Sequence, residues 1–158
     1  KGHYIDQTGF LVADTDGKKI FFSGDALSGR NVIKKYWIQY LFDEKLSKES
    51  LMKISKIQAD FYVPGHGQAV KEIEGLVELN MLAYLETEEL ILSILKNPKT
   101  TEQILKEVAD VNEISLRLNQ YVLIGCTIRS YLSALCDAKK IKYEIIDNVM
   151  YWSRTKDN

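Results

Sequence analysis

The chain of 158 residues has few of the residue types that mark several common protein classes. It has two cysteines and two prolines, and its formal net charge is −1. Two cysteines are too few for a scaffold held together by disulfides. A charge near zero gives no general attraction to nucleic acid or to anionic membranes. No apolar run approaches the roughly 20 residues that span a bilayer. These absences favour a soluble globular protein, which we expect in the cytoplasm and without a membrane partner.

The two cysteines, Cys126 and Cys136, lie ten positions apart within one helical pattern. Cysteine is among the residue types most often found buried, and cytoplasmic thiols stay reduced. We therefore expect two buried free thiols rather than a disulfide or a pair of metal ligands.

The first part of the chain predicts a β-hairpin. Residues 9–14 and 19–23 are short, apolar and rich in residues that favour strands, and the intervening residues 15–18 read Thr-Asp-Gly-Lys. Such a segment is typical of a tight reversal between two antiparallel strands.

A mixed α/β layer structure is expected to follow the hairpin. Residues 26–43 read as a loop, and residues 48–58 have the spacing of an amphipathic helix with Ser47 as its N-cap. Residues 60–63 form a third strand-like run, which Pro64 is expected to end. Strands and a helix with apolar faces predict an α/β sandwich.

From about residue 72 the pattern becomes mainly helical. Residues 74–96 form a long helical run stopped by Asn97-Pro98, and a capping-box pattern at Thr100 and Gln103 opens a shorter helix. Residues 116–139 are again helical, and residues 140–153 read as two strands around the turn Asp147-Asn148. Three helices followed by a hairpin is the order of a winged-helix module. We therefore expect two domains, residues 1–74 and residues 75–158.

Three side chains are candidates for metal chemistry. Asp25 follows Phe-Phe-Ser-Gly, His66 stands between two glycines after Pro64, and His3, the only other histidine, follows Gly2. Each has an ordinary explanation when taken singly, such as a turn, a loop or a chain terminus. Two imidazoles and one carboxylate at rigid strand ends are nevertheless the donors that Zn²⁺ or Fe²⁺ prefers, and a carboxylate can bridge two cations. Together they indicate part of a metal site.

The order Gly2-His3, two strands, Ser23-Gly24-Asp25, a helix, a strand and Pro64-Gly65-His66-Gly67 resembles the C-terminal half of a metallo-β-lactamase-fold hydrolase. The resemblance implies an αβ/βα sandwich with two divalent cations. Zinc is the first expectation, and iron and manganese are the alternatives. It assigns His3 to the first metal, His66 to the second and Asp25 as the catalytic bridge between them. Glyoxalase-II-like and endoribonuclease-like relatives append a small helical or winged-helix domain, which residues 74–154 resemble.

The sequence departs from the family pattern in two informative ways. The His-x-His-x-Asp-His motif of the N-terminal half is absent, so a missing N-terminal half or a swapped second copy must complete the site. The isolated segment is then expected to be inactive. The bridging residue is Asp25, whereas many true zinc β-lactamases have cysteine. This favours an ester, thioester or phosphodiester substrate over antibiotic hydrolysis.

The alternative function is a winged-helix module that binds a partner or nucleic acid without catalysis. Residues 76–158 hold ten Lys or Arg and twelve Asp or Glu, a net charge of −2. Nucleic-acid readers usually show a basic face, so DNA binding is the weaker interpretation. Shaping a substrate pocket or forming a homodimer are further roles that the sequence leaves open for this region.

Overall fold

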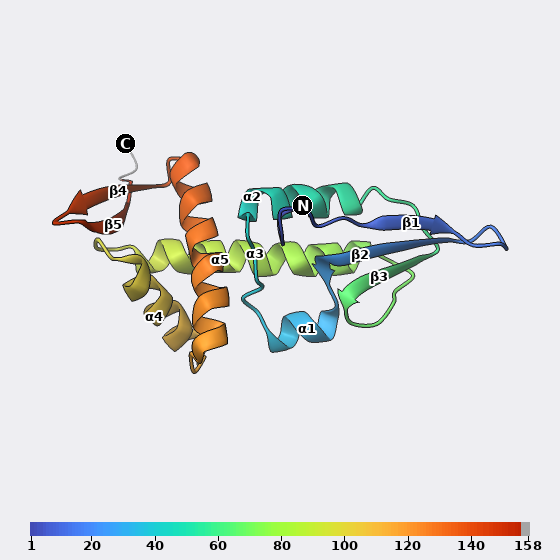
Figure 1. Cartoon of the computed structure of the whole chain (residues 1–158), viewed down its shortest axis with the longest axis horizontal. Coiled ribbons are helices and arrows are strands. Elements are labelled where there is room, and N and C mark those ends of the chain that lie inside the picture. Colours follow the sequence, from blue (N-terminus) through green and yellow to red (C-terminus); the bar gives the residue numbers. More distant parts are fainter. Residues whose placement is uncertain (156–158) are drawn as a thin grey trace. The chain divides into compact units, whose positions relative to one another are not determined.

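Figure 1 shows the computed structural model of the chain, which describes residues 1–155. The chain forms two compact units: unit 1 is Lys1–Leu85, and unit 2 is Glu86–Asn158. Unit 1 contains β1 (Phe10–Ala13), β2 (Lys19–Ser28), α1 (Arg30–Lys35), α2 (Glu44–Ile54), β3 (Phe61–His66) and the first part of α3 (Glu74–Ile94). Unit 2 contains the rest of α3, α4 (Thr101–Val111), α5 (Leu118–Asp137), β4 (Ile141–Ile146) and β5 (Val149–Arg154). The division into domains at residues 74 and 75 stays a prediction.

The predicted hairpin is confirmed. β1 pairs antiparallel with β2, from Phe10 opposite Phe22 to Ala13 opposite Lys19, and the Asp14 amide donates to the Lys18 carbonyl at 2.7 Å across the turn. β2 also pairs in parallel with β3, so the sheet has the order β1-β2-β3 (Figure 1). The carboxyl ends of β2 and β3 therefore lie at the same edge of the sheet.

Two predictions about the residues after Asp25 are wrong in detail. Residues 26–43 are not all loop, because β2 continues to Ser28 and α1 follows it. Helix α2 begins at Glu44, and its N-cap is Asp43 rather than Ser47. The Asp43 carboxylate accepts a hydrogen bond from the Leu46 amide at 2.8 Å. Ser47 lies one turn inside the helix, where its hydroxyl donates to the Asp43 carbonyl at 2.7 Å. A carboxylate satisfies the free amides of a first turn as well as a serine does, so either residue could have been the cap.

The prediction that Pro64 ends the third strand is also wrong, since β3 continues to His66. Proline lacks an amide donor and is tolerated in edge strands and at bulges. β3 is one of the two edge strands of its sheet, and Pro64 pairs with Gly24 where the register between β2 and β3 shifts. The extra residues of β3 carry the backbone directly to His66.

The cores of both units are apolar. In unit 1 the fully buried side chains come from β2, from the helices and from the segments that join them: Leu27, Ile33, Leu41, Leu51, Ile73 and Ala83. In unit 2 they come from the three helices and from Leu95, which directly follows α3: Ile91, Leu95, Ile104, Leu105, Val108, Ile128 and Leu132. Among residues 1–155, no helix is long and apolar enough to cross a membrane.

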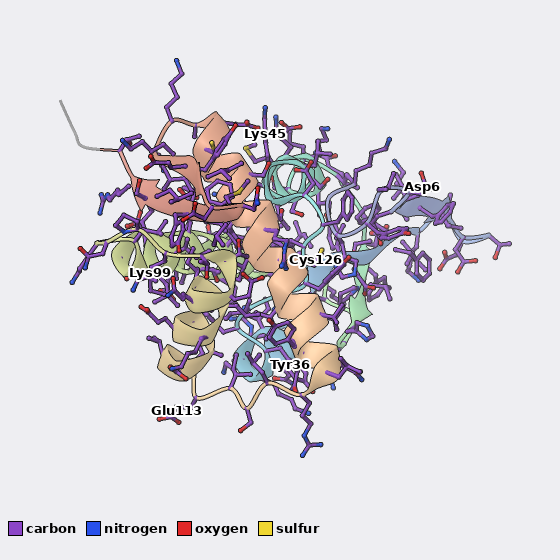
Figure 2. All side chains as sticks on the ribbon, turned by 60° about the vertical axis from the view of Figure 1, so that its left-hand side comes forward. Asp6, Tyr36, Lys45, Lys99, Glu113 and Cys126 are labelled. Atoms are coloured by element: carbon purple, nitrogen blue, oxygen red, sulfur yellow. The ribbon has the colours of Figure 1, made fainter. Side chains whose placement is uncertain are left out.

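The predicted elements of unit 2 are confirmed close to their expected limits. The capping box of Thr100 and Gln103 opens α4, and Lys99 and Glu113, labelled in Figure 2, flank this helix. Asp147 and Asn148 adopt φ values of 50° and 61° between β4 and β5, as a tight hairpin requires. The order of three helices and a hairpin agrees with the expectation, and its assignment as a winged helix stays a prediction.

Within residues 1–155 neither cysteine of α5 forms a disulfide, and each is only half-buried. Cys126, labelled in Figure 2, and Cys136 lie on this helix, which supplies a buried face to the core of unit 2. The expectation of two buried thiols is therefore met only in part, because both side chains are half-buried beside that face.

Candidate metal centre

The end of β2 places the Asp25 carboxylate. Ser23 is buried at 1% exposure, and its hydroxyl donates to the Gly24 carbonyl at 3.0 Å. Gly24 has a φ of 53°, in the left-handed region that side chains other than glycine disfavour, and the register with β3 shifts on either side of it. This local kink lies inside β2, four residues before its last residue, and the Asp25 side chain remains 35% exposed.

The end of β3 brings His66 to the same place. The Gly29 amide donates to the His66 carbonyl at 2.8 Å, and a Cβ built on Gly29 would lie 2.8 Å from the Gly67 Cα. A Cβ on Gly65 would overlap Asp25 Oδ1. The glycines of the Pro-Gly-His-Gly segment are thus required for space: side chains there would displace β2 or the carboxylate itself.

His3 is part of the folded structure despite its place near the start of the chain. The Gly2 carbonyl accepts hydrogen bonds from the Phe42 and Asp43 amides at 3.0 and 2.9 Å. The imidazole packs edge-on against the Tyr40 ring, with 5.1 Å between ring centroids. The His3 side chain is 27% exposed, whereas that of His66 is 74% exposed. Tyr40 was not a candidate from the sequence, because its contact with His3 joins residues 37 positions apart.

All three candidate side chains meet in unit 1. His3 Nε2 lies 3.5 Å from Asp25 Oδ2, and His66 Nε2 lies 3.5 Å from Asp25 Oδ1. One carboxylate thus stands between two imidazoles, and each imidazole faces a different oxygen. This is the arrangement that a carboxylate bridging two cations would need.

The separations fit metal coordination. A tetrahedral cation with bonds of about 2.1 Å to nitrogen and oxygen holds neighbouring ligand atoms about 3.4 Å apart. Both nitrogen-to-oxygen distances agree with that spacing. Within residues 1–155, no group of three or more His, Cys, Asp or Glu side chains could hold a single ion. Each of two cations would therefore take one imidazole and one carboxylate oxygen from this chain, and its other ligands must come from elsewhere.

The protonation state of His3 suits the same role. Burial lowers the pKa of His3 below its ordinary value of 6.5, and the Asp25 carboxylate and a hydrogen bond with the Tyr40 backbone oppose this effect only in part. A lowered pKa favours the neutral imidazole at neutral pH, which is the form that binds metal.

A shallow hollow of about 610 Å³ lies along α3 in unit 1. Its lining combines two charged side chains, Arg30 and Glu78, with apolar side chains of α3: Val77, Leu79, Met81, Leu82 and Leu85. Arg30 is exposed and follows Gly29, whose amide binds the His66 carbonyl. Arg30 thus joins the residue after β2 to the apolar surface of α3.

The chain is similar in structure to two solved proteins of low sequence identity. A β-lactamase domain protein from Burkholderia ambifaria matches with a TM-score of 0.72 at 16% identity, over 98% of this chain and 45% of that one. A metallo-β-lactamase family protein from Thermus thermophilus matches with a TM-score of 0.59 at 14% identity, over 96% of this chain and 54% of that one. The chain spans about half the length of both proteins. No family model and no curated protein matches it.

Proposed function

Since the chain has part of the metallo-β-lactamase fold, we propose that it supplies one side of the binuclear metal site of a hydrolase. The observation that carries the proposal is the Asp25 carboxylate, which stands 3.5 Å from each of two imidazoles through different oxygens. His3 would bind one cation, His66 the second, and Asp25 would bridge them.

The cations would be two divalent ions, with zinc as the first choice for nitrogen and oxygen ligands and iron or manganese as alternatives. When bound, such a pair lowers the pKa of water and stabilises negative charge on oxygen. The residues of this chain do the positioning. Gly65 leaves room for the Asp25 carboxylate, and burial favours the neutral form of His3 by lowering its pKa.

The substrate class that we propose is an ester, a thioester or a phosphodiester. Each of these reacts through an oxygen that gains negative charge, which the proposed cations would stabilise. The exposed Arg30 guanidinium offers an anionic part of such a substrate a charged partner, and the apolar side chains along α3 offer its remainder a surface.

The site needs a second half, and the sheet of unit 1 suggests where that half packs. Four apolar side chains of β1 and β2 are exposed by 41% to 63%: Phe10, Leu11, Val12 and Phe22. Apolar groups gathered on one sheet usually mark a surface that another element covers. We propose that the missing N-terminal half, or a swapped second copy, packs on this sheet and brings the other metal ligands.

A second candidate role concerns unit 2 alone. Its net charge is negative, and Leu118, Tyr121 and Val122 at the start of α5 are exposed by 44% to 79%. Exposed apolar side chains suit a protein partner or a homodimer better than a nucleic acid. A salt-dependent gel shift with nucleic acid would reverse this preference, and a mass measurement in solution would test the homodimer.

Elemental analysis of the full-length protein tests the main proposal. We expect about two transition-metal ions per chain after purification without chelator. The isolated 158-residue segment, prepared in the same way, is expected to hold no stoichiometric pair and to show no hydrolase activity. A full-length protein without bound transition metal would contradict the proposal. Full activity of the isolated segment would contradict the need for a second half.

A further inference from the structure

We propose that Asn80 of α3 is a positioning residue for the candidate metal centre. Its carboxamide holds the end of β2, and through that strand end it sets the places of Asp25, His66 and the segment behind His3. The inference rests on the proposed function, which it extends to a residue that contacts none of the three candidate ligands.

The Asn80 side chain is fully buried and makes three hydrogen bonds. Its Oδ1 accepts from the Ser28 amide at 3.0 Å, and its Nδ2 donates to the Ser28 carbonyl at 3.0 Å. Nδ2 also donates to the carbonyl of Leu76, one turn earlier in α3, at 2.8 Å. A carboxamide that pairs with both the amide and the carbonyl of one residue replaces a neighbouring strand at that position.

The end of β2 needs such a partner because β1 pairs with β2 only from Lys19 to Phe22. The parallel pairing of Ser28 with His66 runs through the neighbouring Gly29 amide, so the amide and carbonyl of Ser28 itself face away from β3. A buried amide or carbonyl without a partner is costly. Asn80 supplies the missing pair from the helix, 52 positions along the chain.

The contacts of Asn80 with Ser28 are connected to His66 through the neighbouring residue, Gly29. Ser28 pairs with His66 across the sheet, and the next amide, that of Gly29, donates to the His66 carbonyl at 2.8 Å. Asp25 lies three residues before Ser28 on the same strand. The contacts of Asn80 thus fix the strand end that joins the carboxylate to the second imidazole.

The same strand end also holds the segment behind His3. The Ser28 hydroxyl donates to Gln39 Oε1 at 2.5 Å, and Gln39 Nε2 donates to the Tyr36 carbonyl at 2.6 Å. The next residue, Tyr40, packs its ring against His3 and hydrogen-bonds to it through its backbone. Ser28 is thus paired with His66, lies on the same strand as Asp25, and is connected to His3 through Gln39 and Tyr40. Asn80 holds Ser28.

The test is Asn80→Leu in the full-length protein, with Asn112→Leu as the matched control. Asn112 also donates from Nδ2 to the carbonyl four residues earlier, that of Val108, at 2.8 Å, but it caps the end of α4 in unit 2. Two readouts are needed: zinc affinity by chelator competition, and hydrogen exchange of the Gly29 amide in the metal-free protein.

For Asn80→Leu we expect zinc to bind about 10- to 100-fold more weakly, as for residues that orient metal ligands, and the Gly29 amide to lose protection. Asn112→Leu should change neither readout. Wild-type zinc affinity in a folded Asn80→Leu variant would overturn the proposal. So would equal losses of affinity in the two variants, because Asn80 would then act only through general stability.

Two further results keep the outcomes distinct. If the wild-type protein binds no metal, the proposed function fails, and hydrogen exchange of the Gly29 amide alone decides the role of Asn80. Lost protection in Asn80→Leu supports that role, and unchanged protection overturns it.

If Asn80→Leu does not fold, Asn80→Gln replaces it. The longer side chain keeps the donor and acceptor but displaces Ser28, so we expect a roughly 3- to 10-fold loss of zinc affinity. Wild-type affinity of that variant would overturn the proposal.

Discussion

Unit 1 and unit 2 use their polar side chains in different ways. Both histidines of the chain lie in unit 1, where they meet one carboxylate at the ends of two strands. In unit 2 the polar contacts include helix caps such as that of Thr100, and surface pairs such as that of Lys106 with Asp110. The first arrangement orients groups toward one point, and the second stabilises individual helices. The comparison suggests that substitutions in unit 1 change metal binding most, and that substitutions in unit 2 change folding most.

The two units also differ in how closely their backbones approach. The strand ends of unit 1 touch through Gly29 and Gly67, and Gly65 leaves space for the Asp25 carboxylate. Unit 2 is packed mainly through long apolar side chains of its helices, such as Leu105 and Leu132. A site built on close backbone contacts tolerates added atoms poorly, whereas a packed core tolerates lost atoms poorly.

Replacing the bridging carboxylate should have the largest effect. Asp25→Ala in the full-length protein removes the group that lies against both imidazoles, so we expect loss of the metal pair and at least about a 100-fold fall in turnover of generic ester or phosphodiester substrates. Metal analysis and steady-state kinetics measure these changes. Asp16→Ala, in the exposed hairpin turn, is the control and should change neither. Unchanged rates in Asp25→Ala would refute the bridging role.

Truncating the core of unit 2 should have the next largest effect, on stability alone. Leu105 is 2% exposed, so Leu105→Ala should lower the free energy of unfolding by about 2–5 kcal/mol in chemical denaturation. The metal content of the folded protein should stay the same, because all three candidate ligands belong to unit 1. Leu118→Ala is the control. This side chain is 79% exposed, so its removal should change the free energy of unfolding by less than about 0.5 kcal/mol. A Leu105→Ala protein that folds but loses its metal would contradict the inference that substitutions in unit 2 change stability without changing metal binding.

Adding one methyl group to unit 1 should have a smaller effect, directed at the site. In Gly65→Ala the new Cβ would overlap Asp25 Oδ1, so the carboxylate must move. We expect metal affinity to fall by about 10- to 100-fold, as for other changes that misorient a ligand. Gly75→Ala serves as the control, because its Cβ would meet only Arg30 Nη2 at an ordinary 3.7 Å. Equal affinities in the two variants would show that Gly65 does not position Asp25.

Removing a helix cap from unit 2 should have the smallest effect. The Thr100 hydroxyl accepts a hydrogen bond from the Gln103 amide at 3.2 Å. Thr100→Ala should therefore lower the free energy of unfolding by about 1 kcal/mol, as measured by thermal or chemical denaturation. Lys106→Ala in the same helix removes an exposed ion pair with Asp110 and should lower the free energy of unfolding by less than Thr100→Ala does. If both substitutions lower the free energy of unfolding equally, the capping box contributes no more to stability than a surface ion pair.

Most elements could be predicted because their signals are local. The hairpin of β1 and β2, the capping box of α4 and the turn at Asp147-Asn148 each depend on residues a few positions apart. The errors fell where two local signals competed, as Asp43 and Ser47 did for the N-cap of α2. The continuation of β3 past Pro64 depended on its place at the edge of the sheet, which the sequence does not show.

The sequence by itself identified His3, Asp25 and His66 as candidates, because histidine is rare in this chain and each of the three follows a glycine. Only the tertiary structure decided that they meet. Parallel pairing of β2 with β3 brings together residues 41 positions apart, and the Gly2 contacts with residues 42 and 43 bring in His3. Asn80 and Tyr40 gave no local signal, since their roles depend on distant partners. Local chemistry can be read along a chain, whereas the distance between two strand ends is set by the packing of the fold.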